Sequence, residues 1–184
     1  MTPEQIEQVR RRARCVYSEA EVEAALDRLA RQISDKLADS NPLLLCVLHG
    51  ARIVTDKLVA RLPFPVQQDT LHATRYRGAT AGGELLWKAK PRTSLHNRVV
   101  LIIDDILDEG ATLAKIVAWC REQQCTAVYT AVLVEKLHDH KLSAIRADFV
   151  GLQAADEYLF GYGMDYHEQL RDAAGIFAID ERDK

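Results

Sequence analysis

The chain has 184 residues, of which 48% are hydrophobic and 28% charged, and this balance is typical of a soluble globular protein rather than a disordered one. Its net charge of -3 argues against general affinity for nucleic acid, and no apolar run reaches the length of a membrane span or forms a signal-peptide core. We therefore expect a single domain, 1–184, in the cytoplasm, with no nucleic-acid partner and no membrane partner.

Two helices are predicted before residue 40. Thr2 is a capping residue followed by Pro3 in the first helical turn. Ser18 and Glu21 form a capping box ahead of apolar residues at helical spacing. We expect residues 1–38 to form a helical N-terminal cover.

Short apolar runs alternate with helical patterns in the rest of the chain. Helices are predicted at 51–62 and 112–124, and strands at 42–48, 66–76, 98–104, 126–134, 147–154 and 175–180. Fully apolar strands that alternate with helices are typical of a parallel sheet covered on both faces. The predicted fold class is therefore α/β, with a doubly wound, mainly parallel sheet and flanking helices. In such sheets ligands bind beyond the carboxyl ends of the strands.

The four cysteines include no Cys-x-x-Cys pair. Cys46 and Cys120 lie within apolar patterns, where a thiol usually packs as a small hydrophobe. We expect buried or unreactive thiols in a reducing compartment, rather than disulfides or a zinc site.

The apolar strand 99–103 leads into the most unusual stretch of the sequence. Six residues carry its chemistry: Asp104, Asp105, Asp108, Glu109, Gly110 and Thr112. We expect 106–111 to be a loop that enters a helix near Thr112, where exposed N–H groups and the helix dipole attract a phosphate. Paired carboxylates suit Mg²⁺ or ribose hydroxyls. The pattern favours a sugar-phosphate ligand, and an acidic first helical turn without a ligand is the alternative.

A receiver domain also ends its first strand in paired acids that bind Mg²⁺. Such a domain needs its phosphoacceptor aspartate at the end of a later strand. Here Asp148 precedes its predicted strand, and only 36 residues follow it. We therefore discount a receiver domain.

The stretch VVLIIDDILDEGATL, 99–113, closely resembles the phosphoribosyl pyrophosphate (PRPP) motif of type I phosphoribosyltransferases. LLCVLHGA, VLVEKL and DFVGLQAADEYLFGYGMDYHEQLRD resemble three further segments of the hypoxanthine-guanine enzymes of that family. These are the pyrophosphate loop, the purine-contacting lysine segment and the C-terminal hood. The resemblance implies Mg²⁺-dependent transfer of 5-phosphoribose from PRPP to hypoxanthine or guanine, with IMP or GMP and pyrophosphate as products.

The resemblance also implies a role for each matching residue. The ribose-phosphate group would contact Asp104, Asp105, Glu109, Gly110, Ala111 and Thr112. Pyrophosphate would contact Leu48, His49, Gly50 and Arg171, and the purine would contact Lys136, Tyr158 and Leu159. Asp108 would be the general acid/base, and Asp104, Asp105 and Asp165 would hold Mg²⁺.

Further expectations follow from the same resemblance. Residues 74–97, with Arg75 and Tyr76, would form a flexible lid hairpin, and 136–184 a purine-binding hood. The family often has a cis peptide bond at the position of Leu48–His49. Its members are dimers or tetramers, so we expect a homodimer or homotetramer.

Three residues depart from the family pattern. Arg75, His49 and Glu109 stand where the family usually has serine, lysine, and threonine or serine. Histidine is only partly charged near neutral pH, so pyrophosphate binding would depend on pH. The Glu109 side chain would either point away from the phosphate or join the metal site. Two alternatives stay open: a regulator of this fold that binds PRPP or nucleotide with weak or no catalysis, and an enzyme that prefers xanthine.

Overall fold

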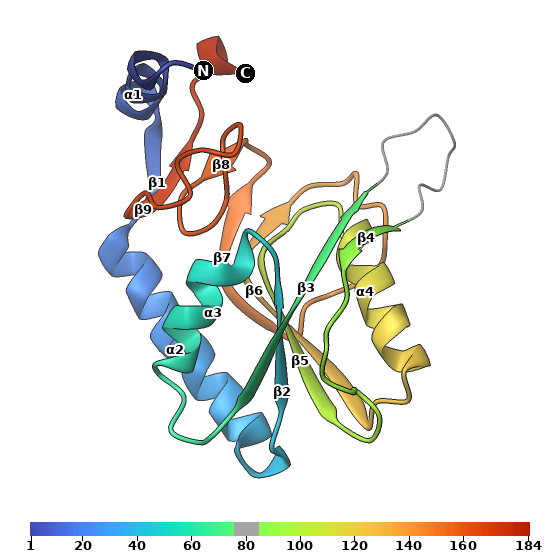
Figure 1. The fold of residues 1–184 in the computed structure, drawn as a ribbon. Coiled ribbons are helices and arrows are strands. Elements are labelled where there is room, and N and C mark those ends of the chain that lie inside the picture. The colour runs from blue at the N-terminus through green and yellow to red at the C-terminus, as the bar shows by residue number, and fades with distance from the viewer. Residues whose placement is uncertain (76–84) are drawn as a thin grey trace.

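A six-stranded sheet forms the centre of the protein in the order β4-β3-β2-β5-β6-β7 (Figure 1). The structure is a computed structural model that describes residues 1–75 and 85–184. Only β3 and β4 pair antiparallel, and the other neighbours in this sheet are parallel. The strands are β2 (Leu43–Val47), β3 (Gln67–Arg75), β4 (Leu85–Ala89), β5 (Val99–Leu107), β6 (Ala127–Leu137) and β7 (Phe149–Ala155).

Helices cover both faces of this sheet. Helices α2 (Glu19–Leu37) and α3 (Ala51–Val59) lie on one side, and α4 (Ala111–Glu122) lies on the other (Figure 1). The predicted α/β, doubly wound, mainly parallel architecture is therefore confirmed. The connections place the start of α3 after β2 and the start of α4 after β5, at the carboxyl edge of the sheet.

The core lies between the sheet and these helices. All five residues of β2 are buried, and so are residues 100–103 of β5. On α2 the buried positions recur at helical spacing: Val22, Ala25, Leu26, Leu29, Ala30, Ile33 and Leu37. Cys46 and Cys120 are free and buried within this core, as predicted, and burial raises the pKa of both thiols.

A second, smaller sheet of strands β1-β9-β8 stands beyond the carboxyl edge of the main sheet (Figure 1). It joins distant parts of the chain: β1 (Arg14–Ser18), β8 (Leu159–Phe160) and β9 (Gly175–Ala178), all antiparallel. Helix α1 (Pro3–Arg12) packs on it through Val9, which clusters with Phe160, Tyr166, Ala173 and Ile179. We call α1 and these three strands the small sheet unit. Two 3-10 turns complete the elements, η1 (Ala38–Ser40) and η2 (Glu181–Asp183).

Both predicted N-terminal caps are present. Thr2 caps α1 in a capping box with Gln5, and Ser18 caps α2 in a capping box with Glu21. Strand β1, however, was not predicted, because its five residues show no strict alternation and become a strand only by pairing with β9. The N-terminal region is thus not wholly helical.

Strand β5 is longer than predicted. It passes through the paired acids to Leu107, because Ile106 and Leu107 pair with Val134 and Glu135 of β6. The predicted loop 106–111 therefore shrinks to the three residues between Leu107 and Ala111, where α4 begins. Asp104 and Asp105 therefore lie within a strand that continues beyond them.

The structure describes only the two ends of the predicted lid, residues 74–75 and 85–97. Strands β3 and β4 form an antiparallel hairpin pair, in which Arg75 lies opposite Leu85. Tyr76 lies outside the described residues. Arg75 is the last residue of β3, and its expected contact with a phosphate-rich ligand stays a prediction.

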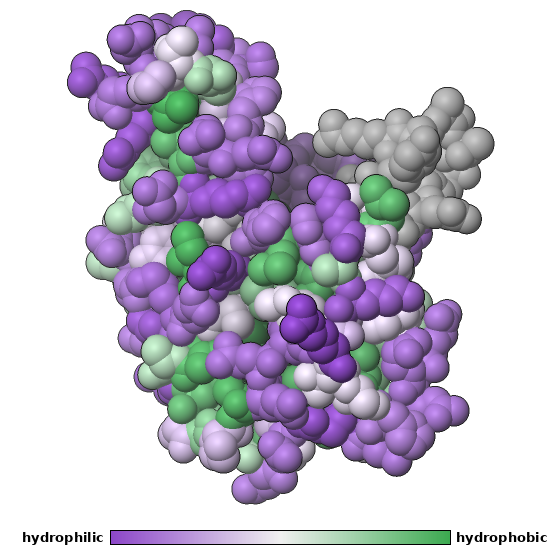
Figure 2. Space-filling view, viewed as in Figure 1, coloured by the Kyte–Doolittle hydropathy of each residue, from purple (hydrophilic) through white to green (hydrophobic). Residues whose placement is uncertain are grey.

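On the face that Figure 2 shows, the apolar side chains are scattered rather than gathered in one patch. Hydrophilic residues cover most of that face, and hydrophobic residues form small separate groups between them. None of the helices in the described parts of the chain combines the length and apolar character needed to cross a membrane.

An ionic network links the β8–β9 connection to helices α2 and α3. Glu23 of α2 accepts hydrogen bonds from Lys57 at 2.5 Å, from the Tyr162 hydroxyl at 2.6 Å and from Arg61. Lys57 and Arg61 belong to α3 and the residues just after it, and Tyr162 follows β8. Burial alone would raise the pKa of Glu23, but these three donors lower it from 4.5 to about 2.

The Glu23 network predicts a pH-dependent stability. Because the folded pKa lies below the unfolded one, the contribution of Glu23 is complete above pH 4.5 and is lost as pH falls towards 2. Glu23→Gln should lower the free energy of unfolding by about 2 kcal/mol at pH 7. Urea denaturation at several pH values should show the difference from wild type narrowing below pH 4.5.

The matched control is Glu7→Gln, which breaks an exposed pair between Glu7 and Arg11 on α1. We expect that variant to unfold like wild type, since exposed pairs contribute little. If the difference in unfolding free energy between Glu23→Gln and wild type stayed constant from pH 7 to pH 3, the ionised Glu23 carboxylate would not be its source.

Candidate active site

The predicted site residues converge at the carboxyl edge of the main sheet. Residues 48–50 follow β2, residues 104–110 end β5 and enter α4, and Lys136 is the penultimate residue of β6. Asp156 comes directly after β7. Neighbouring parallel strands end at the same edge, so side chains that lie far apart in the sequence meet there.

The paired acids of β5 are half-buried and adjacent. The Asp104 carboxylate accepts the Asp105 N–H at 3.1 Å, and the Asp105 carboxylate accepts the Ile106 N–H at 2.9 Å. Burial, together with the neighbouring charge of Asp105, raises the pKa of Asp104 well above its usual value. Burial also raises the pKa of Asp105, although its hydrogen bonds and the charge of Arg171 oppose this. A bound cation would stabilise the two carboxylates in their ionised form.

Gly50 lies against this acid pair. A Cβ atom placed on Gly50 would lie 2.0 Å from Oδ2 of Asp105, so only glycine allows the backbone this close to the carboxylate. The peptide bond between Leu48 and His49 is cis, as the family resemblance implies. His49 is exposed, and its ring meets the His72 ring edge to face at 4.6 Å between centroids.

The turn from β5 into α4 forms a small cavity of about 90 Å³. Gly110 has a φ of 80° and precedes the helix without any side-chain cap on the first turn of α4. Residues of the β6–β7 connection support the turn from outside. Lys141 Nζ donates to the Asp108 carbonyl at 2.7 Å, and the Leu142 N–H donates to the Glu109 carbonyl at 2.9 Å. The uncapped helix start leaves N–H groups that suit an anion.

A cluster of charged residues lies beside this turn. Lys136 Nζ donates to Asp108 Oδ2 at 3.0 Å and to Asp156 Oδ1 at 3.4 Å. His138 Nε2 lies 2.9 Å from the other oxygen of Asp108. Burial would raise the pKa of Asp108, but Lys136 and His138 together lower it. Asp108 is therefore a carboxylate at neutral pH.

The β8–β9 connection, residues 161–174, also reaches the site. Gly163, with a φ of 105°, lies so close to Gly50 that a Cβ atom on it would be 1.8 Å from the Gly50 carbonyl oxygen. Arg171 donates to the Gly163 carbonyl at 2.6 Å and pairs with Asp165 at 2.8 Å. Two glycines thus allow the Asp165–Arg171 pair to reach the loop after β2.

Tyr158 and Leu159 differ in exposure. Tyr158 is 45% exposed, and its ring contacts the Tyr166 ring at 5.8 Å between centroids. Leu159 is buried in β8, opposite Ala178 of β9. An exposed aromatic face that is fixed from behind by a second ring is suited to stacking on a flat ligand.

Comparison with known families gives a match over most of the chain. The model of the phosphoribosyl transferase domain matches residues 16–167. The chain belongs to the phosphoribosyltransferase family. The matched range contains every predicted site residue except Arg171, which lies four residues beyond it.

Individual phosphoribosyltransferases match over similar lengths. The hypoxanthine-guanine phosphoribosyltransferase of Bacillus subtilis is 31% identical over 85% of this chain and 87% of its own. The hypoxanthine-guanine-xanthine phosphoribosyltransferase of Tritrichomonas foetus is 26% identical over 91% of this chain and 92% of its own. A crystal structure of a hypoxanthine phosphoribosyltransferase from Staphylococcus aureus superposes with a TM-score of 0.89 at 23% identity, over 99% of this chain and 97% of that one, which shows the shared fold.

Some residues around this phosphoribosyltransferase site were missed by sequence reasoning. His138 contacts Asp108, Asp156 contacts Lys136, and Lys141 supports the turn after β5. None of these three residues was singled out from the sequence. His138 and Lys141 lie four and seven residues beyond the predicted strand 126–134, and Asp156 comes directly after β7. Polar side chains within four residues of each predicted strand end include His138 and Asp156 but not Lys141. The approach of Gly163 to Gly50 gave no sequence signal.

Proposed function

We propose that this phosphoribosyltransferase transfers the 5-phosphoribosyl group of PRPP to N9 of hypoxanthine or guanine and releases pyrophosphate. One observation carries the proposal: Asp108, in the turn suited to a phosphate, is paired at 3.0 Å with Lys136 of the neighbouring strand. This contact brings an acid and a cation, both able to recognise a base, next to the predicted ribose-phosphate site.

The ribose-phosphate end of PRPP would occupy the turn after β5. The N–H groups at the uncapped start of α4 would hold the 5′-phosphate, with backbone contributions from Glu109, Gly110 and Ala111 and the hydroxyl of Thr112. Asp104 and Asp105 would receive the ribose hydroxyls. The cavity of about 90 Å³, lined by Asp104 and residues 106–113, supports this location.

The pyrophosphate group would lie over residues 48–50. Gly50 permits close approach of the backbone, and Arg171 supplies a positive charge near the departing oxygens. His49 would add a charge only when it is protonated. Arg171 is held by the Gly163 carbonyl and Asp165, so its guanidinium is already oriented before the ligand binds.

The carboxylates of this site fit Mg²⁺. Asp104 and Asp105 offer hard oxygen donors. Their burial raises the pKa of both carboxyl groups, and a bound divalent cation would lower it again by stabilising the ionised form. Asp165 would hold a second ion near pyrophosphate. When bound, Mg²⁺ would neutralise the phosphate charges and stabilise the departing pyrophosphate.

Asp108 would handle the proton of the base. A free purine carries one proton on its imidazole ring, and attachment of ribose at N9 requires that this proton leave. An ionised carboxylate near N7 can accept it, and Lys136 and His138 keep Asp108 ionised. In the reverse reaction the same group would return the proton.

Lys136 and Tyr158 would form the base-binding subsite. The Lys136 ammonium has three N–H bonds, and Asp108 and Asp156 accept from it, so one N–H remains for the O6 oxygen of a 6-oxopurine. Tyr158 would stack on the ring, and Leu159 would offer its backbone to the ring edge. A 6-amino group has no lone pair for Lys136, so adenine would be rejected.

The test is pyrophosphate release by the full chain with PRPP and Mg²⁺. Hypoxanthine, guanine, xanthine, adenine and uracil would be supplied separately. Turnover with hypoxanthine and guanine, without adenine or uracil, is the expected result, and dominant turnover with xanthine would identify a xanthine-preferring enzyme. PRPP binding without turnover on any base would overturn the proposal and favour a regulator.

Lys136→Ala provides a test of the base contact. The variant loses a charge-assisted hydrogen bond, which corresponds to a rise in KM for hypoxanthine of about tenfold or more. The KM for PRPP should change much less, because Lys136 does not line the cavity of the turn after β5. Equal loss of both affinities in steady-state kinetics would count against a contact to the base.

We also propose that the enzyme works in the cytoplasm as a homodimer or homotetramer. All four cysteines are free thiols, including exposed Cys15, which suits a reducing compartment. The assembly follows from the family resemblance, and light scattering would measure the number of subunits.

A further inference from the structure

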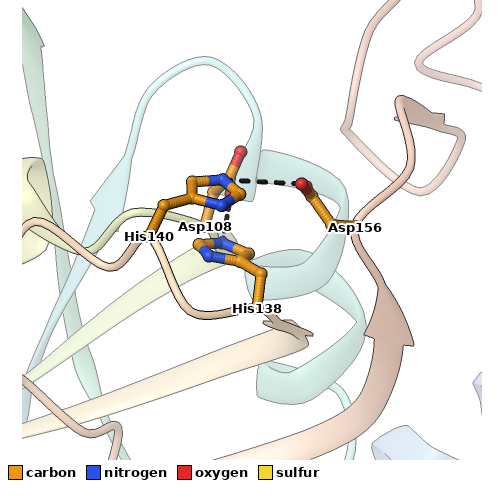
Figure 3. A group of neighbouring side chains, drawn as sticks. All are labelled: Asp108, His138, His140 and Asp156. Atoms are coloured by element: carbon orange, nitrogen blue, oxygen red, sulfur yellow. Dashed lines mark hydrogen bonds and ion pairs between the residues drawn. The ribbon is translucent and has the colours of Figure 1, made fainter.

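Two histidines and two aspartates meet at the base side of the site (Figure 3). The four residues are Asp108, His138, His140 and Asp156, and each offers one ligand atom within 4.8 Å of the other three. They come from three separate parts of the chain: the turn after β5, the connection after β6 and the residue after β7. The fold therefore gathers them, and the sequence places only His138 and His140 close together.

Each aspartate divides its two oxygens between Lys136 and a histidine. Asp108 uses Oδ2 for Lys136 and has Oδ1 2.9 Å from His138 Nε2. Asp156 uses Oδ1 for Lys136 and has Oδ2 3.4 Å from His140 Nε2. One oxygen of each carboxylate thus faces an imidazole nitrogen, and Lys136 keeps its own contacts on the other oxygens.

The two imidazole rings lie face to face, and the His138 ring is the buried one. They stack with 3.7 Å between centroids and 14° between planes. The His138 side chain is only 4% exposed, and its Nδ1 is buried without a hydrogen bond among the residues that the structure describes. A purely structural buried histidine would normally use both ring nitrogens. His138 therefore has an oriented ring whose polar atoms the protein only partly satisfies.

The spacing fits a tetrahedral metal ion. Zinc binds nitrogen and oxygen ligands at about 2.0–2.1 Å, which places neighbouring ligand atoms roughly 3.4 Å apart. The two histidine–aspartate separations are 2.9 and 3.4 Å, and no pair exceeds 4.8 Å. Because an imidazole binds a metal through a lone pair in its ring plane, the exposed His140 ring would turn out of the stack to complete the coordination.

The ligand set and the charge decide which ion fits. Two imidazoles with two carboxylates favour Zn²⁺, Co²⁺, Ni²⁺ or Cu²⁺, whereas Mg²⁺ prefers oxygen ligands alone. With neutral imidazoles, the two carboxylates and the Lys136 ammonium leave one net negative charge on the cluster. A divalent cation would therefore enter a site that attracts it.

We propose that Asp108, His138, His140 and Asp156 form a binding site for a first-row transition-metal ion, separate from the Mg²⁺ sites. Coordination would withdraw Asp108 from the base, so the ion would inhibit transfer. The binding does not depend on the proposed function, and only the inhibition rests on it.

The binding test uses Co²⁺ with the full chain in excess Mg²⁺. Tetrahedral Co²⁺ absorbs strongly in the visible region, so one equivalent of bound ion should be visible and should be displaced by Zn²⁺. His140→Gln should weaken Co²⁺ binding about tenfold or more, because it removes one ligand. The His140 side chain is 58% exposed and takes no part in the proposed transfer, so this variant should fold and turn over normally.

Two further variants locate the site. His96→Gln changes an exposed histidine in the β4–β5 connection and should bind Co²⁺ like wild type. His72→Gln removes one ring of the His49–His72 pair, the other close histidine pair that the described residues contain. Normal Co²⁺ binding by His140→Gln, no tetrahedral spectrum in wild type, or loss of binding in His72→Gln instead would overturn the proposal.

The inhibition arm compares turnover with and without Zn²⁺. Wild type should lose most of its pyrophosphate release at Zn²⁺ concentrations that leave His140→Gln active. Equal inhibition of both proteins would overturn the proposed inhibition. If neither protein turned over any base while Co²⁺ still bound, the proposed function would fail and the metal site would stand.

Discussion

Asp108→Asn is expected to lower kcat for hypoxanthine by about 10²-fold or more, since general acid–base catalysis typically contributes 10²- to 10⁴-fold. Asparagine has nearly the same shape as aspartate, so Lys136 can still donate to its amide oxygen, but the amide cannot accept the purine proton. PRPP affinity should change by less than about threefold, because Asp108 acts on the base. Pre-steady-state turnover and equilibrium PRPP binding would separate the two effects.

The matched control is Asp139→Asn, which replaces an exposed aspartate between the two histidines of the β6–β7 connection. It removes the same charge from the same side of the protein without touching Lys136. We expect normal kcat for this control. Near-normal turnover in Asp108→Asn would remove Asp108 from its proposed role.

Gly163→Ala should disable the pyrophosphate side of the site. The added Cβ would lie 1.8 Å from the Gly50 carbonyl oxygen, at a φ of 105° that alanine rarely adopts. The connection carrying Asp165 and Arg171 must therefore move away from Gly50. We expect stability to fall by about 3 kcal/mol or more and pyrophosphate affinity to fall by about tenfold or more.

Thermal unfolding and pyrophosphate binding by calorimetry would measure both losses. Asp172→Ala is the control, since it places an alanine at an exposed position next to Arg171 and leaves Gly163 unchanged. We expect that variant to unfold and bind like wild type. If Gly163→Ala matched this control, the contact between Gly163 and Gly50 would have no part in holding the site.

The sequence was most informative where local chemistry determines structure. The capping residues Thr2 and Ser18 both start helices, and the apolar runs at 43–47 and 99–103 both lie in central parallel strands. These features depend on residues close together in the chain. The edge of the sheet where ligands bind follows from the same pattern, so the position of Asp104 and Asp105 could be predicted.

Features that depend on distant pairing could not be predicted. Strand β1 exists because β9, about 160 residues later, pairs with it, and β5 continues past its acids because β6 offers partners to Ile106 and Leu107. The approach of His138 to Asp108 likewise needs the relative placement of two strand ends. Neither propensity nor periodicity contains this information.

The pairing of β1 with β9 has a consequence for synthesis of the chain. All six strands of the main sheet are complete once residue 155 has been made, whereas β1 and α1 must wait for β8 and β9. The turn suited to a phosphate can therefore form on the ribosome well before the purine side, which is closed by the last strand made. A polypeptide that stopped after β7 would retain the acids of β5 and Lys136 but lack Tyr158, Arg171 and the partner of β1. Messages truncated near their 3′ end would thus yield a main sheet with an unfinished base pocket, and residues 14–18, left without the partner that makes them a strand, would be exposed to quality control.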